Sequence, residues 1–155
     1  MRIEERVAQL LITAKKTLSI AESCTGGYLT NRLTNIPGSS NFLKLTIVAY
    51  SNAAKIKLLK VPEADIRKYG AISAPIAIRM AQGAQKCLKT DFGIGITGIA
   101  GPAGGTKTKP VGLTYVAVCT STETLCLECH FKGARTNIKA QAASQALRLL
   151  YEFLI

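Results

Sequence analysis

Three separated stretches of the sequence carry residue types that could do chemistry together. The first runs from Ser19 to Gly27, where a short apolar strand over residues 18–21 meets small hydroxyl residues and two glycines. A helix is expected next, so main-chain N–H groups of this turn lie at a positive helix end. A serine hydroxyl beside such donors offers a nucleophile and an oxyanion hole, the requirements of acyl transfer. Ser23 is the candidate nucleophile, and Thr25, Gly26 and Gly27 are the candidate oxyanion donors.

The second stretch supplies a candidate base. Tyr50 ends an expected strand, and Lys55 falls near the start of an expected helix. The positive helix end and partial burial would both lower the pKa of Lys55, and the neutral amine could then take a proton from a serine. Tyr50 could relay that proton or orient the lysine. A solvated helix lysine beside a strand-end tyrosine would give the same pattern, so this stretch alone decides nothing.

The third stretch is a long loop rich in glycine, hydroxyl and lysine residues. It follows an expected strand, where main-chain N–H groups and positive charge can meet an anion. It matches neither a Walker loop nor a dinucleotide fingerprint, so as a bare glycine-rich loop its signal is weak. The candidate ligand-binding residues here are Thr97, Gly98, Gly101, Gly104, Gly105, Thr106 and Lys109.

Hydrophobic patterning places all three stretches at strand ends. Strands are expected over residues 18–21, 42–50, 92–97, 112–119 and 125–131, and helices over 3–15, 26–33, 53–59, 63–68, 76–88 and 137–154. Helix and strand alternate except for one hairpin. This order predicts an α/β fold, a three-layer α/β/α sandwich with a mostly parallel mixed sheet and one antiparallel strand. Ser23, Tyr50 and Thr97 would then share one edge of the sheet.

Composition narrows the class of protein. A chain of 155 residues predicts a single domain over residues 1–155, and the net charge of +11 suits an anionic partner. The lysines are spread along the chain with no run longer than Lys15-Lys16, and no nucleic-acid-binding motif is visible, so nucleic acid is not the expected partner. No apolar run is long enough to span a membrane and no signal-peptide core follows the N-terminus, which predicts a cytoplasmic protein.

The cysteines and the single histidine do not form a metal site. Five cysteines lack the spacing of a disulfide framework, and Cys126 and Cys129 would face opposite sides of a strand. His130 is the only histidine, and no other residues are spaced so as to bind a metal ion together with it. We expect no metal, no cofactor and reduced cysteines.

Four motifs in this order give the chain a resemblance to a known family. They are residues 21–27 (Ala-Glu-Ser-Cys-Thr-Gly-Gly), Tyr50-Ser51-Asn52 with Lys55, Gly70-Ala71-Ile72-Ser73, and residues 97–102 through Gly112. The chain resembles the C-terminal domain of CinA, competence/damage-inducible protein A, in the family of nicotinamide mononucleotide deamidases. The resemblance runs from the first helix to the last.

The resemblance implies a function and roles for residues. It implies a three-layer α/β/α fold. It also implies an enzyme of pyridine nucleotide salvage that hydrolyses the carboxamide of nicotinamide mononucleotide. Ser23 matches the family nucleophile, and Lys55 and Tyr50 match its partners. Thr97 and the glycine loop match positions lining the nucleotide site. Arg135 matches an arginine suited to the substrate phosphate.

The chain departs from the family pattern at two positions. Ala134 stands where the pattern before Arg135 usually has an aspartate, and Lys139 stands where an arginine is common. Longer family members carry another domain before this one, and we expect a stand-alone domain. A homodimer or higher homo-oligomer is expected because most soluble oligomers are symmetric. The alternative function is a non-catalytic module that keeps the fold and binds nucleotides or nucleic acid.

Overall fold

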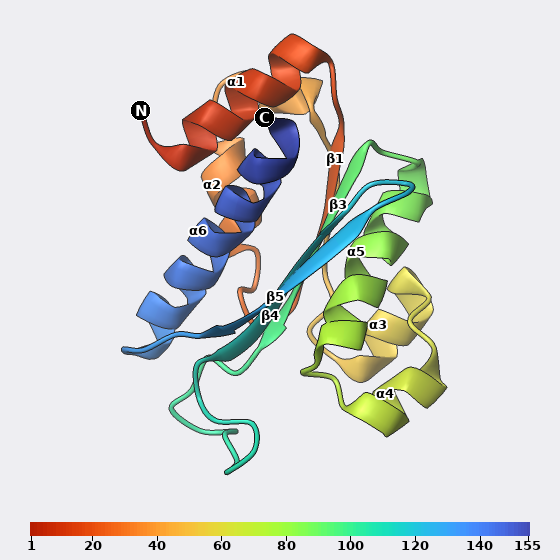
Figure 1. The fold of residues 1–155 in the computed structure, drawn as a ribbon, viewed down its shortest axis with the longest axis vertical. Coiled ribbons are helices and arrows are strands. Elements are labelled where there is room, and N and C mark those ends of the chain that lie inside the picture. The colour runs from red at the N-terminus through yellow and green to blue at the C-terminus, as the bar shows by residue number, and fades with distance from the viewer.

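The computed structural model describes all 155 residues and has three layers (Figure 1). The middle layer is a five-stranded sheet in the order β2-β1-β3-β4-β5. Its strands are β1 (Leu18–Glu22), β2 (Leu43–Val48), β3 (Phe92–Gly98), β4 (Leu113–Cys119) and β5 (Thr124–His130). β1 pairs in parallel with β2 and β3, whereas β4 pairs antiparallel with both β3 and β5. β4 is therefore the one strand that runs against the others, as predicted.

Helices cover both faces of the sheet. α1 (Ile3–Ala14), α2 (Tyr28–Thr34) and α6 (Arg135–Leu154) lie on one face, and α3 (Asn52–Leu59), α4 (Glu63–Tyr69) and α5 (Ala74–Leu88) lie on the other (Figure 1). A 3-10 turn, η1 (Ser39–Asn41), precedes β2. The larger apolar core fills the space beneath α1, α2 and α6, and smaller clusters lie under α5. None of the helices has the length and hydrophobicity that a membrane crossing would need.

The predicted elements all form, with shifted ends. α2 begins at Tyr28 rather than at residue 26, because Gly26 and Gly27 have φ angles of +59° and +95°, which a helix does not accept. β3 carries the expected close packing on its backbone. A side chain at Gly93 or Gly95 would collide with carbonyl groups of α5, so these glycines let the helix lie against the strand.

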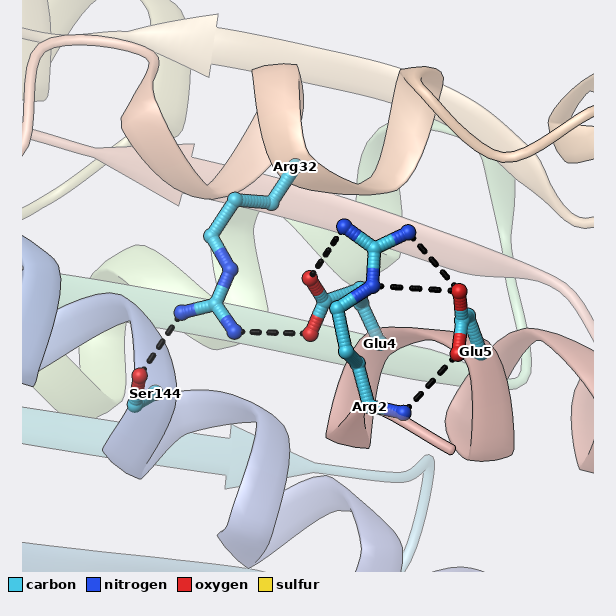
Figure 2. Close-up of polar contacts among 5 residues, drawn as sticks. All are labelled: Arg2, Glu4, Glu5, Arg32 and Ser144. Atoms are coloured by element: carbon cyan, nitrogen blue, oxygen red, sulfur yellow. Dashed lines mark hydrogen bonds and ion pairs between the residues drawn. The ribbon is translucent and has the colours of Figure 1, made fainter.

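A polar network ties α1 to the neighbouring helices (Figure 2). Glu4, only 6% exposed, accepts a hydrogen bond from Arg32 of α2 at 2.7 Å, and Arg32 also donates to Ser144 of α6 at 2.7 Å. Arg2 lies 3.8 Å from Glu4 and donates to Glu5 at 2.7 Å. Burial alone would raise the pKa of Glu4, but the hydrogen bond from Arg32 and the nearby positive charges hold that pKa below its usual value.

Candidate active site

Ser23 stands directly after β1, in a turn whose two ends are clamped. The buried carboxylate of Glu22 accepts hydrogen bonds from the main-chain N–H groups of Leu29 and Thr30, at 3.1 and 3.0 Å, and from the Thr30 hydroxyl at 2.7 Å. Within the turn, the N–H of Gly26 donates to the carbonyl of Ser23 at 3.0 Å. Glu22, before the turn, is thus bound to Leu29 and Thr30, after it. This restrains the turn and therefore the position of Ser23.

Lys55 lies against the Ser23 hydroxyl. Its Nζ is 3.1 Å from Ser23 Oγ and 3.0 Å from the carbonyl oxygen of Ala49, and the side chain is 3% exposed. No carboxylate forms an ion pair with Lys55. Burial lowers the pKa of Lys55, since the ammonium form loses its hydration without gaining a counter-charge. A neutral amine in hydrogen-bond range of a hydroxyl can act as its general base.

Arg135, the first residue of α6, joins three parts of the chain. Its Nη1 donates to the carbonyl of Gly101 at 2.6 Å, and its Nη2 donates to the Tyr50 hydroxyl at 3.1 Å. The guanidinium thus links α6, the loop after β3 and the segment after β2. These two contacts orient Arg135, although the preceding residue, Ala134, offers it no side-chain acceptor.

These side chains line one cavity of about 280 Å³ at the carboxyl ends of the parallel strands. The cavity residues are Ser23, Cys24, Tyr50, Asn52, Lys55, Ala71, Ile72, residues 97–101, Ala103, Gly104 and Arg135. Lys55 and Arg135 are its cationic members, and the lining contains neither aspartate nor glutamate. A ligand with negative charge would therefore meet attraction and no like charge from the lining.

Comparison with known proteins places the chain in a family. The model of the CinA C-terminal domain family matches residues 1–154. The chain belongs to this family. It is 48% identical to a CinA-like protein of Syntrophus aciditrophicus over 98% of its length, and 46% identical to one of Dictyoglomus thermophilum over 96%. In both comparisons the chain spans only 36% of the relative.

Solved structures agree with the fold. The competence/damage inducible protein CihA from Agrobacterium tumefaciens is 35% identical with a TM-score of 0.92, covering 98% of this chain and 96% of that one. A CinA superfamily protein from Escherichia coli is 32% identical with a TM-score of 0.93, covering 97% of this chain and 88% of that one. The α/β/α arrangement is thus shared across the CinA superfamily.

In this CinA domain the nucleophile turn lines the cavity only in part. Ser23 and Cys24 line it, whereas Thr25, Gly26 and Gly27 do not. The N–H of Gly26 is moreover committed to Ser23. Gly26 therefore does not fit the predicted role of oxyanion donor, whereas for Thr25 and Gly27, whose main-chain N–H groups have no acceptor within the protein, the role stays a prediction. The main-chain N–H groups of the cavity residues Ala100 and Gly101 also have no acceptor within the protein, so they are further candidates.

The glycine-rich loop divides into a cavity part and an outer part. Gly98, Gly101 and Gly104 line the cavity, but Gly105, Thr106 and Lys109 do not. The outer part folds on itself, since the Thr106 N–H donates to the Lys109 carbonyl at 2.7 Å. Lys109 Nζ donates to the Tyr69 carbonyl at 2.8 Å. The outer residues therefore hold the loop against the end of α4 instead of facing a ligand.

Thr97 and Tyr50 both line the cavity, and each is held by a hydrogen bond to another part of the chain. The Thr97 hydroxyl donates to the carbonyl of Ala71 at 2.9 Å, which fixes the connection between α4 and α5 as a cavity wall. Tyr50 is 61% exposed and hydrogen-bonds to Arg135, not to Lys55 or Ser23. Tyr50 is thus a partner of Arg135, and the expected relay to Lys55 is not formed.

Cys24 follows Ser23 in the same turn and is a second possible nucleophile, but it is poorly suited to react. The thiol is 8% exposed, and burial is the main reason that its pKa is raised to about 11. At neutral pH it is therefore a thiol rather than the nucleophilic thiolate.

Sequence reasoning gave no role to six residues of the cavity lining, which are Asn52, Ala71, Ile72, Ile99, Ala100 and Ala103. A signal was present for them, because all six lie in or beside the motifs that carried the resemblance.

Proposed function

We propose that this domain hydrolyses the carboxamide of nicotinamide mononucleotide to nicotinate mononucleotide and ammonia. One observation carries the proposal: a buried lysine amine, with no counter-ion, lies 3.1 Å from a serine hydroxyl in a cavity free of carboxylates. That pair has the geometry of a serine nucleophile and its base. Because the chain spans about a third of its curated relatives, the proposal concerns this domain alone.

The reaction divides into two balanced halves. The Ser23 oxygen attacks the amide carbon while Lys55 takes the hydroxyl proton. The tetrahedral oxyanion then accepts hydrogen bonds from the main-chain N–H groups of Ala100 and Gly101. Collapse breaks the C–N bond, and the protonated Lys55 returns its proton to the leaving ammonia. Water then attacks the carbonyl carbon of the acyl-serine ester while Lys55 takes one of its protons. The bond between that carbon and Ser23 Oγ breaks, Lys55 returns the proton to Ser23 Oγ, and nicotinate mononucleotide leaves.

Arg135 is the proposed reader of the substrate phosphate. It lines the cavity at the N-terminus of a 20-residue helix, where helix dipole and guanidinium charge act together on an anion. Its present partners are neutral oxygens, which a phosphate can replace or supplement. Nicotinamide riboside, which lacks the phosphate, should be a poorer substrate by about one to two decades in kcat/KM.

Ammonia release from nicotinamide mononucleotide by the purified chain tests the proposal. We expect turnover by the wild type and by Ser40→Ala, a control at an exposed serine, and no measurable turnover by Ser23→Ala. The Ser23→Ala, Lys55→Met double variant should be little worse than either single variant, because the two side chains form one proton-transfer unit.

The same assay separates the proposal from its rivals. Folded wild-type protein that binds the nucleotide without releasing ammonia would make the chain a binding module. An active Ser23→Ala protein with an inactive Cys24→Ala protein would move the nucleophile to the thiol.

A further inference from the structure

Lysines gather around the C-terminal end of α5. Three helices, α1, α3 and α5, carry lysines in or just after their last turns; these are Lys15, Lys16, Lys57, Lys60, Lys86 and Lys89. In Figure 1, α1 and α5 end at the top of the view, and the loop after β3 lies at the bottom. Lys16 and Lys89 come just before the starts of β1 and β3, so the length of a strand, about 17–20 Å, separates this level of the sheet from Ser23. α3 lies lower, beside α4 (Figure 1).

Pairing in the core brings the three helix ends together. β1 and β3 begin side by side, with Leu18 opposite Phe92, so the segments before them are neighbours. Lys16, before β1, pairs with Asp91, before β3, at 3.3 Å. α3 joins the group through Gly83 of α5, where any side chain would collide with the carbonyl of Leu59. The end of α3 therefore lies beside Gly83 in the later part of α5, and the segment after α1 lies beside the segment after α5.

Two depressions flank the end of α5 on this surface. One, of about 270 Å³, is lined by Lys60, Lys86 and Arg79, the last already paired with Asp65 at 3.2 Å. The other, of about 480 Å³, is lined by Lys16 and Lys89. The second depression also has the hydroxyl residues Thr90, Thr120, Ser121 and Thr122.

Positive charge on this surface is poorly compensated. Asp91 is the one carboxylate that lines either depression, and it is bound to Lys16 and Thr17. Lys60, Lys86 and Lys89 pair with no carboxylate.

The backbone at these helix ends is unusual in the same way three times. Lys15, Lys60 and Lys89 are the only non-glycine residues of the chain with positive φ, at 54°, 58° and 52°. Each stands just after a helix, where glycine or asparagine is the usual residue. The left-handed conformation disfavours a residue with a Cβ, so lysine is not the residue that backbone preference selects there.

The chemistry of the surface selects among anionic partners. Lysine and hydroxyl side chains are the groups that contact phosphate oxygens of nucleic acids. The cations are divided between two hollows instead of converging on one point, which suits a chain of phosphates better than a single phosphate. No aromatic residue other than the buried Phe92 lines either hollow, so bases have nothing to stack on.

We propose that the lysine-lined surface around the C-terminal end of α5, with the ends of α1 and α3 beside it, binds nucleic acid through its phosphate backbone without reading the sequence. This surface is separate from the cavity and does not depend on the amidase proposal. Binding of this kind is electrostatic, so affinity falls steeply with salt.

Fluorescence anisotropy with a labelled 30-base-pair DNA duplex tests the proposal. The patch variant Lys60→Asn, Lys86→Gln, Lys89→Asn removes three charges and places asparagine, which accepts positive φ, at the two strained positions. The control variant Lys44→Gln, Lys68→Gln, Lys132→Gln removes three exposed charges elsewhere, so both variants have the same net charge.

At about 0.1 M salt we expect the patch variant to bind at least tenfold more weakly than the control, with a log K against log salt slope shallower by about 2–3. A duplex of scrambled sequence should bind like the original, and ammonia release by the patch variant should equal that of the wild type. Equal losses in the two variants, no binding at 50 mM salt, or binding only to anionic lipid vesicles would overturn the proposal.

Discussion

Lys55 at the cavity and Glu4 in the first helix both have ionisable side chains that are buried, at 3% and 6% exposure. Glu4 has Arg32 at 2.7 Å, whereas Lys55 has only neutral oxygens within hydrogen-bond range. Both pKa values are lowered, but with opposite meaning, since Glu4 is kept charged and Lys55 is pushed toward neutrality. Pairing secures a helix in one region, and the lack of a counter-charge creates a base in the other.

The largest expected effect is the loss of turnover when Lys55, the buried residue without a counter-charge, is replaced. Lys55→Met keeps the length of the side chain and removes the amine, so ammonia release should fall by about 10³-fold, the range for loss of a general base. Lys57→Met, two residues along the same helix and exposed, is the matched control and should retain full activity. Wild-type turnover by the Lys55→Met protein would show that the amine is not the base.

Breaking the pair between Glu4 and Arg32 should mainly lower the stability of the fold. Arg32→Met leaves the Glu4 carboxylate buried without its main donor, which should lower the free energy of unfolding by about 2–3 kcal/mol while kcat stays unchanged. The control is Arg67→Met, because the exposed Arg67–Glu63 pair at 4.0 Å should contribute less than about 0.5 kcal/mol. Urea unfolding of the three proteins checks this, and equal midpoints for both variants would contradict the role given to Glu4.

Changing the pH should separate the two groups. The lowered pKa of Lys55 predicts that turnover rises with pH in a range below 10.5, the value of an ordinary lysine. The lowered pKa of Glu4 predicts stability that is complete above pH 4.5 and is lost as pH falls through the folded-state pKa. Rate and melting temperature measured over the same pH series check both, and Arg32→Met should weaken the acid-dependent loss. A stability curve that is unchanged in this variant would argue against the Glu4–Arg32 pair.

The smallest expected effect is a gain in stability, whereas the predictions above are losses of activity or stability. The folded-state pKa of Lys55 is below that of the unfolded chain, so at neutral pH this residue opposes folding. Lys55→Met should therefore raise the melting temperature, by about 2–4 °C for a gain near 1 kcal/mol. Calorimetry on the inactive variant is the measurement. A lower melting temperature would mean that the bonds to Ser23 and Ala49 outweigh the cost of burial.

Local patterns in the sequence were enough to predict the layers, the strand directions and the meeting of Ser23 with Lys55. Both residues stand beside parallel strand ends, and parallel strands bring such ends to one edge. Contacts between distant segments were not predictable in this way. Arg135 reaches Tyr50 and Gly101 only because the start of α6 comes to lie over the cavity.

The lysine surface was hidden for the same reason. Its lysines are spread from residue 15 to residue 89, and only the pairing of β1 with β3 and the packing of α3 on α5 gather them. The two parts of the glycine-rich loop also looked alike in sequence. Their separation depends on the reach of Lys109 to the Tyr69 carbonyl, which composition does not encode.

The strand order also bears on the sequence of events in folding. β3, β4 and β5 pair with neighbours close along the chain and contact α5, whereas β1 must insert between β2 and a strand some seventy residues later, with Leu18 opposite Phe92. Closing so long a loop is entropically costly, so we expect α5 and the β3–β5 meander to form first and β1 to dock late. Ser23 would then reach Lys55 only in the final step. Pulse-labelled hydrogen exchange during refolding should show late protection of β1, and early protection there would exclude this order.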